Sequence, residues 1–136
     1  MSWSNYLDSI KQKCDGLVAL GIWGDNGVPW AQEGAQLSAA EVAAIANCFT
    51  DDTTILNQGF TIAGNRFVAT KIDKEDFTMI GKGRKEGNKW STGPVTVMKI
   101  KGAIVFAVGN SEVQGGQVNL AVAHIAEFLR DAGFMP

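Results

Sequence analysis

The sequence predicts an α+β fold, with a central antiparallel sheet packed between N- and C-terminal helices and additional short helices. Apolar residues at helical spacing mark both ends of the chain, and between residues 55 and 109 the apolar period changes to two. The chain has 136 residues, of which 46% are hydrophobic and 19% are charged, so it can bury one stable core. We expect residues 1–136 to form a single domain, because no repeat or linker divides them.

The two terminal helices are each predicted from one apolar stripe. The first stripe consists of Trp3, Leu7, Ile10 and Cys14, and Gly16 would end that helix. The last helix is expected over residues 118–133. Its stripe consists of Val118, Val122, Ile125 and Leu129. Both stripes have the spacing of one helical face, so both helices should pack against the sheet.

A further helix is predicted from a capping box at residues 38–41, where Ser38 and Glu41 satisfy each other's backbone donors. Its apolar face consists of Val42, Ile45, Ala46 and Phe49. Residues 51–54 are polar and are interpreted as the loop that ends it.

The strands are predicted from alternation and turn signals. Residues 17–23 and 29–31 flank an Asp-Asn-Gly turn and form a hairpin, with Pro29 marking an edge strand. Residues 103–108 are continuously apolar, which is typical of a central strand. Residues 81–90 are too polar and glycine-rich for a strand interior, so they are interpreted as an extended hairpin tip. The short, evenly spaced strands indicate an antiparallel meander.

Charge and composition argue against several classes of protein. A net charge of −2 and a pI of about 5.3 disfavour nucleic-acid binding, which needs a basic surface. The sequence contains no run of about 18 apolar residues, so no membrane span is predicted, and no secretory signal is visible. Cys14 and Cys48 do not make a disulfide framework, so they are expected to be reduced in the cytosol.

Catalytic chemistry has little support in the sequence. His124 is the only histidine, and no Cys/His spacing fits zinc. The glycines at 81, 83 and 87 match no phosphate-binding motif. We therefore predict no cofactor, no metal and no enzymatic activity. A small enzyme that uses His124 or a cysteine stays open as the third hypothesis, without a substrate.

The aromatic residues at the two ends of the chain suggest a binding groove. Trp3 and Tyr6 share a helix face, and Phe128 lies beside the core stripe of the last helix. If the terminal helices pack together, a shallow groove is lined by Trp3, Tyr6, Trp30, Phe128 and Phe134. Such grooves bind polyproline II ligands, because rings stack on proline and Trp or Tyr donates to ligand carbonyls. The alternative is that these rings are core residues.

Four segments in order resemble the profilin family. They are residues 2–8 (SWSNYLD), 59–67 (GFTIAGNRF), 113–119 (VQGGQVN) and 125–134 (IAEFLRDAGF). Together they span nearly the whole chain, although each is a weak motif by itself. The resemblance implies the profilin fold and a cytoplasmic, cytoskeleton-associated protein that binds monomeric actin and proline-rich proteins such as formins. It also implies regulation of actin polymerisation and nucleotide exchange.

The resemblance also implies which residues form each face. The aromatic set above matches the polyproline-binding positions, although some relatives have histidine at Phe128 and tyrosine at Phe134. The positions that match the actin face are Leu56, Arg66, Ala69, Lys71, Val113, Gly116, Asn119, Leu120 and His124. Arg66 and Lys71 would pair with carboxylates on actin. Leu120 stands where some relatives have lysine, so one ion pair is missing.

Two further readings remain open. The cluster of Lys82, Arg84, Lys85 and Lys89 could contact actin or anionic phosphoinositide head groups, and the alternative is a solvated hairpin. For the whole chain, the second hypothesis is a longin- or roadblock-like scaffold module. Such a module would use the aromatics as core residues and would bind partner proteins or dimerise. Shielding of Trp3 and Trp30 from solvent quenchers would favour it.

Overall fold

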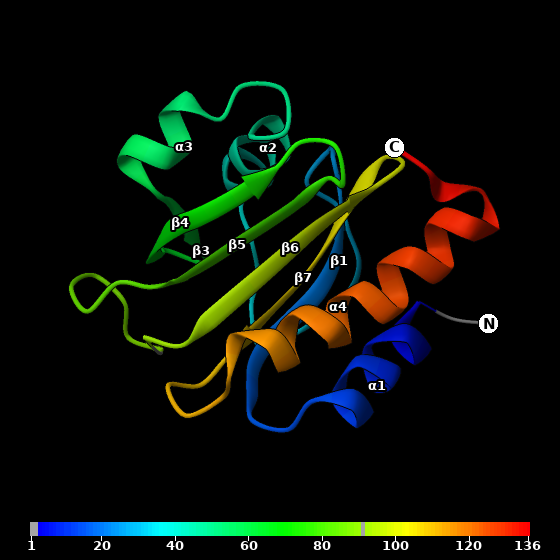
Figure 1. The fold of residues 1–136 in the computed structure, drawn as a ribbon, viewed down its shortest axis with the longest axis horizontal. Coiled ribbons are helices and arrows are strands. Elements are labelled where there is room, and N and C mark those ends of the chain that lie inside the picture. The colour runs from blue at the N-terminus through cyan, green and yellow to red at the C-terminus, as the bar shows by residue number, and fades with distance from the viewer. Residues whose placement is uncertain (1–2, 91) are drawn as a thin grey trace.

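A computed structural model describes residues 3–90 and 92–136, and these residues form a seven-stranded antiparallel sheet in the order β2-β1-β7-β6-β5-β4-β3 (Figure 1). The strands are β1 (Leu17–Gly24), β2 (Pro29–Glu33), β3 (Phe60–Ile62), β4 (Asn65–Asp73), β5 (Thr78–Gly83), β6 (Pro94–Ile100) and β7 (Ala103–Gly109). The predicted meander is confirmed from β3 to β7. The β1–β2 hairpin then joins the sheet through β7, with Ile22 opposite Val105.

Helices cover both faces of this sheet. On one face, α1 (Ser4–Lys13) and α4 (Gly115–Leu129) lie side by side (Figure 1). On the other face lie α2 (Ala39–Asn47) and the short α3 (Thr53–Gln58). The α+β prediction, with the sheet packed between terminal and additional short helices, is therefore confirmed.

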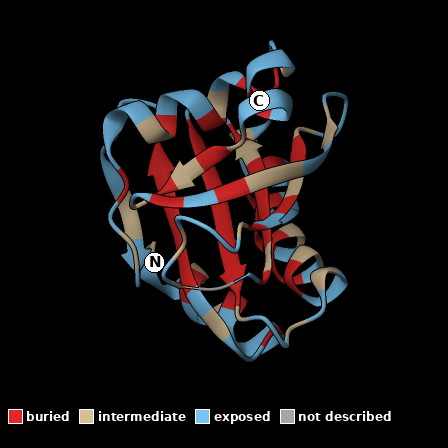
Figure 2. Ribbon diagram, turned by 90° about the vertical axis from the view of Figure 1, so that its left-hand side faces the viewer, coloured by how far each residue is buried: buried red, intermediate tan, exposed pale blue. Residues whose placement is uncertain are grey.

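Two hydrophobic clusters, one on each side, make up the core. Along β7, Ile104 and Phe106 pack under α2, whereas Val105 and Ala107 pack under α1 and α4. Figure 2 shows this pattern as buried strands between helices whose outer sides are exposed. Because β7 is covered on both faces, its sequence is apolar without alternation, as expected for a central strand.

The predicted helical stripes occupy the positions that the spacing assigned to them. Leu7, Ile10 and Cys14 are buried, and so is the whole stripe of the last helix. The capping box is also present: the Glu41 N–H donates to Ser38 Oγ at 3.1 Å, and the Ser38 N–H donates to Glu41 Oε1 at 2.9 Å. Local sequence signals therefore predicted the buried sides of α1 and α4 and the start of α2.

The helix α3 corrects one prediction. Residues 53–54 were expected in a loop and residues 55–58 in an extended segment, but all of them are helical. Asp51 Oδ1 accepts the Thr53 N–H at 3.0 Å, which orients the first turn. Within the helix only Ile55 is buried, so a segment of six residues shows too little periodicity to be recognised.

The predicted hairpin tip at residues 81–90 is also partly wrong. β5 continues to Gly83, so residues 81–83 belong to a strand. A Cβ on Gly81 would lie 2.2 Å from the Val68 carbonyl oxygen, so this position needs glycine for close approach of β4. The following loop folds back rather than extending, because Arg66 N–H donates to Gly87 O at 3.0 Å.

The last helix begins and ends differently from the expected 118–133. α4 starts at Gly115 and finishes at Leu129, and a π-helical turn, Arg130–Phe134, follows it. Within that turn Gly133 has φ of 114°, a conformation that a residue with a Cβ rarely adopts. Among the described residues, no helix has the length and apolar character needed to cross a bilayer.

Candidate functional site

The five predicted groove aromatics form one continuous ring cluster, which we call the aromatic cluster. Trp3 is at its centre, with ring centroids 4.7 Å from Trp30, 5.5 Å from Tyr6 and 5.6 Å from Phe134. Phe128 extends the cluster through Tyr6, at 6.1 Å. These separations lie in the range of favourable aromatic pairs. Rings from three distant parts of the chain therefore lie together, as the sequence led us to expect.

Four elements position this cluster. Trp3 and Tyr6 stand at the start of α1, Trp30 lies on the edge strand β2, and Phe128 is close to the end of α4. Phe134 is brought back to them because the π-helical turn reverses the chain and its carbonyl accepts the Lys101 N–H at 2.7 Å. The two termini thus build one surface together with the sheet edge.

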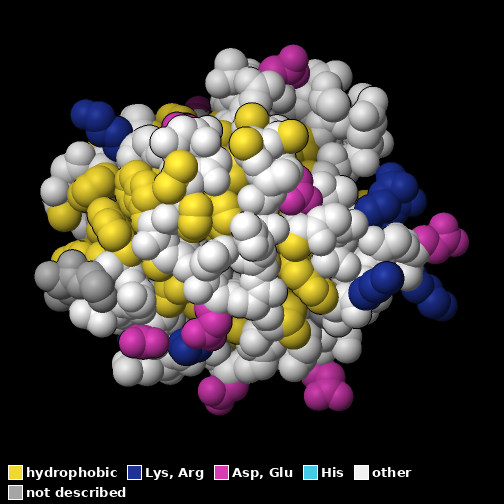
Figure 3. Space-filling model, turned by 180° about the vertical axis from the view of Figure 1, so that it is seen from behind, with side chains coloured by type: hydrophobic (Ala, Val, Ile, Leu, Met, Phe, Trp, Pro, Cys, Tyr) yellow, Lys and Arg dark blue, Asp and Glu magenta, His cyan; other side chains and the backbone are white. Residues whose placement is uncertain are grey.

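The aromatic cluster is accessible to a ligand. Trp3, Tyr6, Trp30 and Phe134 are half-buried, and Phe128 is 54% exposed. Seen from behind, hydrophobic side chains gather on the side of the molecule where the termini meet (Figure 3). By contrast, Trp23 is buried at 1% exposure in the core. The scaffold hypothesis, in which these rings would be core residues, does not match this exposure.

The positions matched to the actin face come from β4, α3 and the start of α4, and we call this set the band. Lys71 lies opposite Ile80 on β5. Two residues before Ile80 on the same strand, Thr78 lies opposite Met98 of β6, which packs under α4. Because directly opposite residues and alternate residues share a face, Lys71 lies on the α4 side of the sheet. Arg66 is exposed at the other end of β4.

A β-bulge separates Ala69 from this band. The β4–β5 register shifts between Ala69 and Lys71, so Thr70 is the extra residue. Ala69 therefore packs against the cluster under α2, on the opposite face from Lys71. Sequence spacing alone would have put Ala69 and Lys71 on one face, and nothing in the sequence marks the bulge.

The start of α4 completes the band. Leu120 is 73% exposed, Gly116 and His124 are exposed, and Val113 is half-buried in the preceding loop. Leu56 on α3 is also exposed, at 47%. Asn119 differs from these, because its side-chain oxygen is buried and has no hydrogen-bond partner among the described residues. Exposed apolar side chains on the same set of elements as exposed cations suit a protein partner.

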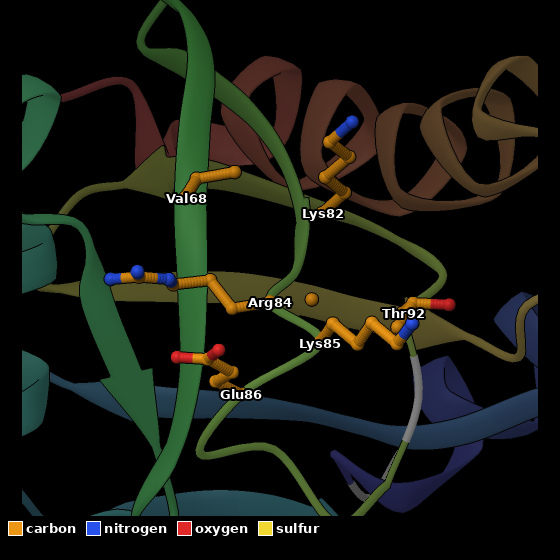
Figure 4. A pocket seen from close by; sticks show the side chains of 7 residues that line it. Val68, Lys82, Arg84, Lys85, Glu86 and Thr92 are labelled. Atoms are coloured by element: carbon orange, nitrogen blue, oxygen red, sulfur yellow. The ribbon is translucent and has the colours of Figure 1, made fainter.

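The basic cluster is only partly brought together. A pocket of about 600 Å³ beside β4 is lined by Lys82, Arg84 and Lys85, with Val68, Glu86 and Thr92 (Figure 4). In Figure 4, Lys82 points toward α4, Lys85 toward Thr92, and Arg84 away across β4. Lys89 instead lines a separate pocket with Trp90. Trp90 itself packs against the core, which makes it a clamp for this loop.

Neither cysteine has the properties of a nucleophile. Burial raises the pKa of the Cys48 thiol to about 12, with a further contribution from the nearby Asp52 carboxylate, and burial also raises the pKa of Cys14. A thiol with such a pKa stays protonated at neutral pH. Within residues 3–90 and 92–136, no group of His, Cys, Asp and Glu could hold a metal ion.

Comparisons with known proteins agree over almost the full chain. A family model described as profilin matches residues 1–134. Profilin-2 of Acanthamoeba castellanii is 36% identical over 135 residues, which cover 98% of this chain and 100% of that protein.

Solved structures give the same likeness. The crystal structure of Acanthamoeba castellanii profilin II has a TM-score of 0.82 at 31% identity, covering 98% of this chain and 100% of that one. Mouse profilin IIa, solved in complex with a double repeat from the FH1 domain of mDia1, has a TM-score of 0.82 at 24% identity with the same coverage. The likeness therefore includes the sheet and both terminal helices that carry the aromatic cluster.

Proposed function

Because this chain belongs to the profilin family, we propose that it binds monomeric actin and proline-rich ligands on two separate faces. As a profilin, it is a regulator of actin polymerisation and not an enzyme. Residues 1–136 act as one domain in this proposal, and the cytoplasm is the compartment in which it would meet actin.

The aromatic cluster is the face we assign to proline-rich ligands, and its accessible, contiguous rings are the observation that carries the proposal. Rings stack on the flat faces of proline, and the ligand is already extended, so it loses little conformational entropy on binding. Phe128 and Phe134 have no polar group, so side-chain donors to the ligand come from Trp3, Tyr6 and Trp30. Formin segments rich in proline are the partners we expect.

The band on β4, α3 and α4 is the face we assign to actin. Lys71 and Arg66 would supply steering charges, and Leu120 with Leu56 would supply apolar contacts. The band lies over the sheet and the start of α4, whereas the aromatic cluster lies where the two termini meet. One molecule can therefore hold actin and a proline-rich tether together.

Simultaneous binding is the experiment that tests this arrangement. Monomeric actin should be retained on a polyproline resin only when the protein is present, and free polyproline peptide should release both proteins together. If added actin instead displaces the protein from the resin, the two ligands compete, and the proposal of two separate faces is contradicted. Failure of the protein to bind either ligand would overturn the proposed function itself.

We also infer a weaker contact with anionic phosphoinositide head groups at the basic pocket beside β4, because three basic residues and one acidic residue line a space of about 600 Å³. A double variant that carries Lys82→Ala and Lys85→Ala should bind less tightly to vesicles that contain phosphatidylinositol bisphosphate. Lys89→Ala is the matched control, because Lys89 lies outside this pocket. Equal binding to neutral vesicles, or equal losses in both variants, would remove this second function.

A further inference from the structure

The bulge in β4 decides which side chains of that strand face solvent. Ala69 lies opposite Gly81 on β5, but the next pair along the ladder is Lys71 with Ile80, so Thr70 is one residue more than β5 can match. Side chains of a strand alternate between its two faces. The extra residue therefore reverses the alternation for every position that follows it in β4.

This reversal is what brings Lys71 to the surface. If the ladder continued without the shift, Lys71 would lie opposite Met79, which is fully buried in the core under α2. With the shift, Ile72 lies opposite Met79 and packs against that core, whereas Lys71 is exposed on the other face. Lys82, two residues after Ile80 on β5, shares the face of Lys71 and lines the basic pocket (Figure 4). The bulge thus places two cations on one face of the sheet.

A side-chain hydrogen bond closes the bulge. The Thr70 hydroxyl donates to the Ile80 carbonyl oxygen at 3.0 Å, so the bond crosses from β4 to the residue that lies opposite Lys71. Thr70 is exposed, and its side chain spends its polar group on this bond to the backbone. Threonine is β-branched and has few χ1 states to lose, so it can hold such a bond at little entropic cost. The extra residue is therefore tied down directly beside Lys71.

We propose that Thr70 is a positioning residue for the actin face: its hydroxyl holds the bulge in the geometry that aims Lys71 at the partner. The inference rests on the proposed binding of actin and adds to it the residue that sets the direction of the Lys71 side chain. Burial of Ile72 keeps the shifted register in place when the hydroxyl is removed. What is lost is the fixed geometry at the bulge, so affinity falls and the fold is retained.

Two substitutions at Thr70 provide the test. Thr70→Val keeps the shape of the side chain and removes the hydroxyl, whereas Thr70→Ser keeps the hydroxyl and is the matched control. At low ionic strength, Thr70→Val should bind labelled actin monomer about threefold to tenfold more weakly than the parent, and Thr70→Ser about as tightly. The loss should narrow as salt is added, because it acts through the charge of Lys71. Both variants should bind a polyproline peptide as the parent does, which shows that they are folded. Equal actin affinities of Thr70→Val and the parent at low salt would overturn the inference.

A double-mutant cycle with Lys71→Ala separates positioning from direct contact. In the Lys71→Ala background, Thr70→Val should cause no further loss of actin affinity. Additive losses would mean that Thr70 acts independently of Lys71, which overturns the inference. If Lys71→Ala weakens actin binding and Thr70→Val does not, only the inference fails. If Lys71→Ala itself binds actin as tightly as the parent, the assignment of Lys71 to the actin face fails with it.

Discussion

The Arg130 side chain donates two hydrogen bonds to the Lys99 carbonyl oxygen, at 3.0 Å from Nε and 2.8 Å from Nη2. Nη2 also donates to the Phe77 carbonyl oxygen at 3.1 Å. Arg130 is buried at 7% exposure, at the point where α4 gives way to the π-helical turn. This side chain therefore ties the segment that carries Phe134 to β6 and to the turn between β4 and β5.

Arg130→Met is expected to lower the free energy of unfolding by about 1–3 kcal/mol, because the half-buried Lys99 carbonyl oxygen loses both bonds that Arg130 donates. The Phe77 carbonyl oxygen still accepts the Lys99 N–H at 2.9 Å. The variant should also weaken polyproline binding, since Phe134 follows directly from the anchored turn. Chemical denaturation and tryptophan fluorescence measure the two effects. Unchanged stability would show that the anchor is dispensable.

The ion pair between Arg130 and Asp76 supplies a control for that variant. Its N–O distance is 3.5 Å, and the Asp76 side chain is 58% exposed, so the pair is screened by solvent. Asp76→Asn should therefore change the free energy of unfolding by less than about 1 kcal/mol. An effect as large as that of Arg130→Met would mean that the charge pair, rather than the carbonyl bonds, holds the turn.

Glu41 links stability to pH. Burial alone would raise its pKa, but hydrogen bonds from the Gly64 and Ser38 backbone N–H groups outweigh it and lower the pKa below the ordinary glutamate value. A lowered folded-state pKa means that the stabilisation is present above the unfolded pKa of about 4.3 and is lost as pH falls through the folded one. Glu41→Gln should therefore be less stable than the parent at pH 7, and this difference should shrink below about pH 4. A pH-independent difference in urea midpoints would contradict the charge-based account.

Patterns of buried residues made most of the fold predictable. The stripes of α1 and α4, the capping box and the apolar strand β7 each depend on residues close in sequence, so their signals were local. The aromatic cluster was predictable for a related reason: Phe128 lies beside a stripe that was already complete. Its exposure of 54% agrees with that reasoning.

The remaining features depend on contacts that no local pattern encodes. Pairing of β1 with β7 joins residues 17–24 to residues 103–109, and no spacing in the sequence specifies it. The bulge that turns Ala69 away from Lys71 is a feature of the pairing between β4 and β5, where the register shifts. A small pocket lined by Tyr6, His124 and Phe128 likewise exists only once α1 and α4 are packed together.

Trp3→Ala should weaken polyproline binding by about thirtyfold or more, because Trp3 contacts three of the other rings and central aromatic residues contribute about 2 kcal/mol or more. Binding of monomeric actin should change by less than about twofold. Peptide titrations and actin affinity measurements on the same preparation give both values. Trp90→Phe is the control, since Trp90 packs on the other side of the sheet and should leave both affinities intact. Parallel losses of both ligands in a folded Trp3 variant would contradict separate faces.

Lys71→Glu should weaken actin binding by more than about tenfold at low ionic strength and leave polyproline binding unchanged. The exposed Lys71 charge faces the α4 side of the sheet, where it would pair with a carboxylate of actin, and reversal converts attraction into repulsion. Because the Debye length falls from about 30 Å at 0.01 M salt to about 8 Å at 0.15 M, the difference should narrow as salt is added. Lys13→Glu, an equivalent reversal on α1, should have no such effect. If the Lys71 variant binds labelled actin monomer as tightly as the parent at low salt, Lys71 does not belong to the actin face, and Arg66 with the apolar residues of α4 must account for the contact.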